Sequence, residues 1–158
     1  MSCGLALAVT LALTPAVEAP APGAGAPAVS APAAVAGEPL YADIVRRAQR
    51  LEQAVIGFRS ASLKASATPL AIPGFAAFKA EAEALAALDM KGHLDLAARN
   101  ADGDLKCILR GISEDMPLRL EGVEKASSGA AQDLALEELQ HLLNDNAAVI
   151  LAPPQPPV

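Results

Sequence analysis

The chain is predicted to be an all-α protein, a four-helix up-down bundle over residues 39–151, preceded by a signal peptide and a disordered Ala/Pro spacer. Three observations predict this fold class. Apolar residues between Pro39 and Ile150 recur at steps of three and four, the period of helices that bury one face. The same stretch lacks the alternation and the β-branched enrichment of strands. Its four periodic segments are separated by breaks that contain Pro, Gly, Ser and Asn.

Residues 1–19 are predicted to be a signal peptide that is cleaved near positions 16–19, and residues 20–38 a flexible spacer rich in Ala, Pro and Gly. The apolar run from Leu5 to Val17 is interrupted by Pro15, whereas crossing a bilayer takes about 20 apolar residues. We therefore expect the mature chain to have no stable membrane span and to be periplasmic or secreted.

The first helix is predicted from Pro39, a residue suited to an opening turn, to about Ser66. Its inward row contains Ile44, Ala48, Leu51, Val55, Phe58 and Ser62. The second helix is predicted from Pro73 to about Lys91, with Gly92 as its C-terminal stop. The inward row of this second helix contains Phe75, Phe78, Ala82 and Leu85.

The third helix is predicted from Asp104 to Ala126, with a kink at Pro117 because proline cannot donate the helical hydrogen bond. Its inward row contains Leu105, Leu109, Ile112, Met116, Leu120 and Val123. The fourth helix is predicted to start after the Ser-Ser-Gly turn at 127–129 and to end near Leu151. Its inward row contains Leu136, Leu139, Leu143, Asn146 and Ile150.

Asn146 is the one polar residue in the inward row of the fourth helix. A buried Asn can fix the register of a bundle at some cost in stability. An Asn at the end of a bundle can instead bind water, and the sequence does not decide between the two. The Pro-rich residues 152–158 cannot continue the helix and are predicted to form an extended tail.

The charges of the first and fourth helices are complementary. The first helix carries Arg46, Arg47, Arg50, Arg59 and Lys64, whereas the fourth carries acids and no Lys or Arg. In an up-down bundle the first and last helices are neighbours. The opposite charges favour that arrangement, although each exposed pair contributes only about 0 to 1 kcal/mol.

Composition and motifs exclude several classes of function. Aromatic residues make up 3 % of the chain and Trp is absent, which disfavours stacking platforms for sugars or single-stranded nucleic acid. A net charge of −6 disfavours any nucleic-acid partner. Glu114 and Asp115 are adjacent, so they point about 100° apart on a helix and do not converge on one atom. No phosphate-binding loop, Cys-x-x-Cys, His-Glu-x-x-His or Gly-x-Ser-x-Gly motif occurs. We expect neither an enzyme nor a bound cofactor.

Two groups of residues are candidate sites. His141, Glu137 and Asp145 stand at steps of four on the fourth helix and could supply metal ligands from one face. On the outer side of the third helix, the row Cys107, Gly111 and Leu118 is a candidate interaction surface for a protein partner or a homodimer. Removal of Cys3 with the signal would leave Cys107 as the one cysteine of the mature chain, either free or in an intermolecular disulfide.

These observations predict an exported, non-enzymatic helical bundle that acts through protein binding or self-association. The alternative is a periplasmic metal-binding or haem-binding four-helix bundle. That alternative would use His141, His93, Met90 or Met116 as ligands.

Overall fold

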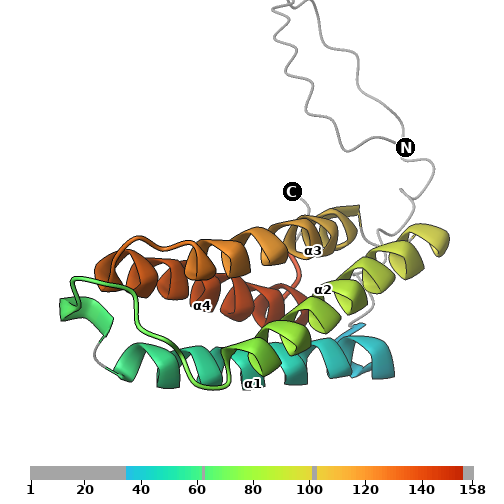
Figure 1. Ribbon diagram of the computed structural model, residues 1–158. Coiled ribbons are helices and arrows are strands. Elements are labelled where there is room, and N and C mark those ends of the chain that lie inside the picture. The colour runs from blue at the N-terminus through green and yellow to red at the C-terminus, as the bar shows by residue number, and fades with distance from the viewer. Residues whose placement is uncertain (1–34, 62, 101–102, 155–158) are drawn as a thin grey trace, which may run out of the picture. The chain divides into compact units, whose positions relative to one another are not determined.

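The computed structural model describes residues 35–61, 63–100 and 103–154, and they form a four-helix bundle without strands. The helices are α1 (Pro39–Ser60), α2 (Phe75–Ala98), α3 (Gly103–Glu124) and α4 (Gly129–Leu151), with short 3-10 turns η1 (Val35–Gly37) and η2 (Leu63–Ala65). Each helix packs against the next and α4 packs against α1, and consecutive helices run in opposite directions (Figure 1). The predicted all-α four-helix fold is confirmed.

Several predictions concern residues outside the described ranges. These are the signal peptide at 1–19 with Cys3, the spacer up to residue 34, Ser62 in the inward row of the first helix, and the last residues of the tail. Within the described residues, none of the helices combines the length and the apolar character needed to cross a membrane.

The end of the predicted spacer belongs to the folded bundle instead. Val35 lies in η1 and is only 4 % exposed, as part of the hydrophobic core. The backbone N–H of Glu38 donates to the Val35 carbonyl, and this turn leads directly into Pro39 at the start of α1. The prediction of a flexible spacer up to residue 38 is therefore wrong for residues 35–38, because burial of Val35 holds this segment on the bundle.

Helix α1 ends at Ser60, earlier than the predicted Ser66. The backbone N–H of Ala61 donates to the Phe58 carbonyl, an i to i−3 bond that tightens the last turn. The Ser60 hydroxyl donates to the Gly57 carbonyl and satisfies another backbone group at this end. The chain then leaves the helix and continues through η2.

Helix α2 continues beyond the predicted stop at Gly92 and ends at Ala98. Gly92 is buried in the helix, where an added Cβ atom would lie 3.1 Å from Leu109 Cδ1 and 3.3 Å from Tyr41 Cε1. The glycine is therefore needed for the close approach of α1 and α3 to α2 and does not act as a helix stop.

Substituting Gly92→Val is expected to lower the free energy of unfolding by about 1 to 3 kcal/mol, because the added atoms overpack this contact. Gly57 is the matched control, since nothing lies within 4 Å of its added Cβ. Gly57→Ala is expected to stabilise the protein by up to about 1 kcal/mol through helix propensity. Urea denaturation of both variants measures the difference, and a neutral Gly92→Val variant would contradict the tight contact.

Two local signals set the starts of α2 and α4. Gly74 precedes α2 with a φ of 80°, a left-handed conformation that glycine adopts at little cost. Ser128 precedes α4 with extended backbone, and its hydroxyl accepts a hydrogen bond from the Ala131 N–H at 3.1 Å. A serine cap of this kind satisfies a backbone donor that the helix cannot satisfy itself.

The inward rows predicted from the sequence form the core. Every described member is buried except Phe58 and Phe75, which are partly buried and pack against it. These two rings join Phe78 in a cluster of all three phenylalanines of the chain, with centroids 5.3 Å apart for Phe58 and Phe78 and 5.7 Å apart for Phe75 and Phe78. The aromatic cluster joins the end of α1 to the start of α2.

The predicted pairing of α1 with α4 is confirmed, but a single arginine makes most of its polar contacts. The Arg59 guanidinium bonds Asp133 Oδ1 at 3.1 Å, Glu137 Oε2 at 3.0 Å and Gln140 Oε1 at 3.0 Å. The bond to Asp133 is the main cause of the raised pKa of Arg59. Elsewhere on α1, Arg46 and Arg47 pair with Asp43 of their own helix, and Arg50 pairs with Glu81 of α2.

Candidate functional site

The candidate site is the outer α3/α4 face, which we define by Gly111 and Leu118 of α3 and Leu134 and His141 of α4. Gly111 stands seven residues before Leu118, and Leu134 stands seven before His141, so each pair shares one side of its helix. Leu118 is 63 % exposed and Leu134 is 57 % exposed. An added Cβ on Gly111 would meet nothing within 4 Å, so the backbone there is open to approach.

A groove lies between α3 and α4 on this face, with a volume of about 420 Å³. It is lined by Asp115, Arg119, Glu138, His141, Leu142 and Asp145. The Arg119 guanidinium bonds Asp115 Oδ2 at 2.9 Å and Glu138 Oε2 at 2.7 Å, and so joins the two helices. Three carboxylates against one guanidinium leave the groove with an excess of negative charge.

The predicted metal ligands are divided between two sides of α4. Glu137 is bound by Arg59 on the α1 side, whereas His141 and Asp145 line the groove beside α3. Four residues advance a helix by about 40° beyond a full turn, so two such steps separate Glu137 from Asp145 by about 80°. Within the described residues, no group of three or more His, Cys, Asp or Glu side chains is placed to hold a metal ion. The metal site stays a prediction that this arrangement does not favour.

The other predicted ligands are also dispersed. His93 lies between α2 and α3, and its Nδ1–H donates to the Lys106 carbonyl at 2.7 Å. Met116 is fully buried in the core, whereas His141 is exposed on the outer α3/α4 face.

The predicted interaction row on α3 is exposed at two of its three positions. Gly111 and Leu118 are exposed, whereas Cys107 is half-buried. Cys107 is also disulfide-bonded. We therefore build the candidate surface on Gly111 and Leu118 and assign no role to the Cys107 sulfur.

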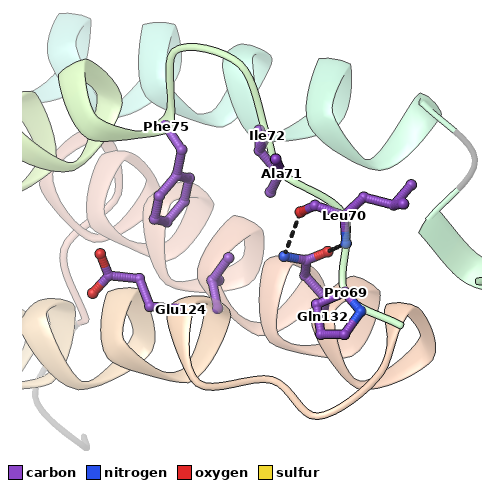
Figure 2. Close-up of a pocket in the computed structure, with 8 residues that line it drawn as sticks. Pro69, Leu70, Ala71, Ile72, Phe75, Glu124 and Gln132 are labelled. Atoms are coloured by element: carbon purple, nitrogen blue, oxygen red, sulfur yellow. Dashed lines mark hydrogen bonds between the residues drawn. The ribbon is translucent and has the colours of Figure 1, made fainter. Parts of the chain in front are cut away.

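A second hollow, of about 250 Å³, lies beside the segment that connects η2 to α2 (Figure 2). It is lined by Pro69, Leu70, Ala71, Ile72, Phe75, Val123, Glu124 and Gln132. The Gln132 side chain holds the segment by two hydrogen bonds: its Oε1 accepts from the Leu70 N–H at 3.0 Å, and its Nε2 donates to the Leu70 carbonyl at 3.1 Å. These two hydrogen bonds to the backbone of one residue resemble the pairing of a β-ladder. They hold the segment between η2 and α2 over this end of the bundle.

A polar network closes the opposite end of the bundle. The fully buried Tyr41 donates from its hydroxyl to Asp95 Oδ2 at 2.7 Å, and Arg99 bridges the same hydroxyl and Glu38. Burial and the bond to Asp95 raise the pKa of Tyr41 to about 12. The network ties the start of α1 to the end of α2 and serves the fold.

The core contains one polar pair that the sequence only half revealed. Asp89 of α2 and Asn146 of α4 are both 0 % exposed, and Asn146 Nδ2 donates to Asp89 Oδ2 at 2.9 Å. The burial of Asn146 removes the predicted alternative of a residue that binds water at a bundle end. Asp89 follows Leu85 by four residues and so continues the inward row of α2, which was the signal available in the sequence.

Comparison with known proteins gives no match. No family model matches the chain, and the comparisons with curated proteins and with solved structures find no match. Any functional proposal must therefore depend on the chemistry of the surfaces and side chains described above.

Proposed function

We propose that the chain is an exported, periplasmic or secreted, non-enzymatic helical bundle that acts by binding a protein partner or a second copy of itself. The outer α3/α4 face is the binding surface. The observation that carries this proposal is the exposure of Leu118 and Leu134, on neighbouring helices, beside a polar groove.

Exposed leucines next to a polar groove have the composition of a small interface. Protein interfaces combine an apolar centre with a polar rim. Burying one leucine side chain contributes about 1.5 to 3 kcal/mol, so Leu118 and Leu134 together can supply a substantial share of a moderate affinity. The open backbone at Gly111 allows a partner to approach α3 closely.

The charges of the groove indicate the chemistry of the partner. Asp115 and Glu138 share Arg119, whereas Asp145 makes no hydrogen bond or ion pair with any described residue. The best complement is a surface that places a Lys or Arg side chain next to an apolar one. The opposite charges would raise the rate of association and orient the partner. The affinity would fall at high salt.

Export is supported by the sequence before the bundle. The apolar run from Leu5 to Val17 and the Ala/Pro/Gly tract that follows it have the composition of a signal peptide and a spacer. A partner would then be met outside the cytoplasm.

Substituting Leu118→Asp is expected to weaken binding about tenfold or more, because it removes an apolar anchor and adds to the negative charge. Leu94→Asp is the matched control, since Leu94 is 59 % exposed but lies on α2. Native mass spectrometry of the full chain, alone and with the cell-envelope fraction, measures complexes with and without reductant. Equal complexes for both variants, or none for the unsubstituted chain, would contradict the proposal.

A further inference from the structure

The Asp89 and Asn146 pair is buried in the core and joins helices that do not pack directly. Helix α2 packs against α1 and α3, and α4 packs against α3 and α1, so the pair spans the diagonal. Both side chains are 0 % exposed, and Asn146 Nδ2 lies 2.9 Å from Asp89 Oδ2. The remaining oxygens, Asp89 Oδ1 and Asn146 Oδ1, are buried and have no hydrogen-bond partner among the described residues.

These two oxygens belong to side chains that already share one hydrogen bond. What they lack is a second hydrogen-bond donor. An ionised carboxylate can only accept hydrogen bonds, and so can the oxygen of an amide. If Asp89 were ionised, both oxygens would remain unsatisfied and a full charge would lie in the core, which is among the most costly arrangements in a protein interior. A single proton on the Asp89 carboxyl group supplies the donor that is missing.

Among the residues that the structure describes, no charged group compensates an ionised Asp89. The buried face of α3 is apolar throughout its described residues, and on α1 the buried Tyr41 hydroxyl is turned toward Asp95. On α4 the buried Asp133 lies thirteen residues before Asn146, about 20 Å along the helix, and is held by a guanidinium. The neighbouring Asp145 is exposed. On α2 itself, Asp89 is the one buried charged residue of those described.

We propose that Asp89 is protonated in the folded bundle and shares its proton with Asn146, forming an uncharged acid and amide pair whose ionisation at alkaline pH weakens the fold. Burial raises the pKa of Asp89 to about 8, and the hydrogen bond from Asn146 acts in the opposite direction. The folded chain thus carries a proton in its core across a range in which an exposed aspartate has lost it.

The sign of the pH effect follows from the two states of the carboxyl group. In the unfolded chain Asp89 ionises near pH 4, whereas in the folded chain it keeps its proton to about pH 8. Between these values the folded state binds one more proton than the unfolded state, so stability falls as pH rises. The stability that this proton contributes is fully present below about pH 4 and is lost as the pH rises past the pKa of Asp89 in the folded chain.

The experiment compares the full chain with Asp89→Asn by urea denaturation from pH 5 to pH 9. The substitution keeps the shape and neutrality of the pair, and its amide can donate to Asn146 Oδ1. Relative to Asp89→Asn, the folding equilibrium constant of the unsubstituted chain is expected to fall about tenfold per pH unit up to about pH 8. Asp145→Asn is the control, since it removes an exposed acid from the adjacent position and should follow the unsubstituted chain.

Parallel pH profiles for the unsubstituted chain and Asp89→Asn would overturn the proposal. A second measurement does not depend on the variant: the ¹³C NMR signal of the Asp89 carboxyl carbon in the unsubstituted chain. A signal of the neutral acid at pH 6 that titrates toward pH 8 supports the proposal. A carboxylate signal at pH 6 overturns it and would indicate that water or an ion satisfies the pair.

Discussion

Substituting Asn146→Leu is expected to destabilise the bundle by about 1 to 3 kcal/mol, because it leaves the buried Asp89 carboxyl group without its partner. The effect should grow at alkaline pH, since ionisation then leaves an uncompensated charge in the core. Urea denaturation at pH 6 and pH 9 measures the loss of stability and its increase with pH. Ordinary surface substitutions change the free energy of unfolding by about 0.5 kcal/mol or less. A loss no larger than this at both pH values would contradict the hydrogen bond between Asp89 and Asn146.

The double variant Asp89→Leu with Asn146→Leu is the informative control. Replacing both members of a buried polar pair with apolar residues of similar volume is often neutral or stabilising. We therefore expect the double variant to be at least as stable as the unsubstituted chain, although each single substitution is destabilising. The polar pair then serves to fix which helices lie across the diagonal, at some cost in stability.

Substituting Phe78→Ala is expected to have the larger effect, a loss of about 3 to 5 kcal/mol, because it removes the central ring of the aromatic cluster. Phe78 is 6 % exposed and contacts both other phenylalanines. The change should also loosen the connection before α2, since Phe75 and Ile72 line the hollow beside it (Figure 2). Urea denaturation and amide hydrogen exchange across residues 66–74 measure the two effects.

Phe78→Leu is the control for this prediction. Leucine keeps most of the apolar volume, so a loss of less than about 1.5 kcal/mol is expected. If Phe78→Ala and Phe78→Leu were equally stable, or if exchange across residues 66–74 were unchanged in both, the ring contacts would not hold this end of the bundle together.

The sequence predicts the core of this fold well because the relevant signal is local. Steps of three and four place residues such as Leu109 and Leu139 on one face whatever packs against it, and both are fully buried. The start of α4 is equally local, since Ser128 caps the helix through its own side chain.

The errors arise where distant contacts override local signals. Gly92 has the composition of a helix stop, but its missing side chain makes room for Leu109 and Tyr41. Asp89 lies inside the predicted helix, but its pairing with Asn146 joins residues 57 positions apart, which no local pattern reveals. The metal site stays a prediction, and the contact that local spacing could not reveal there is the ion pair of Glu137 with Arg59 on another helix.

The candidate surface is predictable only in part. The periodicity of α3 places Leu118 outward, and it is the most exposed large apolar residue of those described. The groove beside it depends on how α3 and α4 are aligned, and no local pattern reveals that alignment. In the structure, the 2.7 Å hydrogen bond from Arg119 to Glu138 joins the two helices.

The most direct test of a binding function is to place a photo-crosslinking residue at position 118 and, as a control, at position 94 in the full chain. On irradiation in the cells that make the protein, position 118 is predicted to give a discrete product of defined mass. Leu134→Asp on the same face should reduce that product, whereas Leu151→Asp at the end of α4 should not. Products of equal yield from both positions, or a product from 118 that Leu134→Asp leaves unchanged, would contradict a binding role for the outer α3/α4 face.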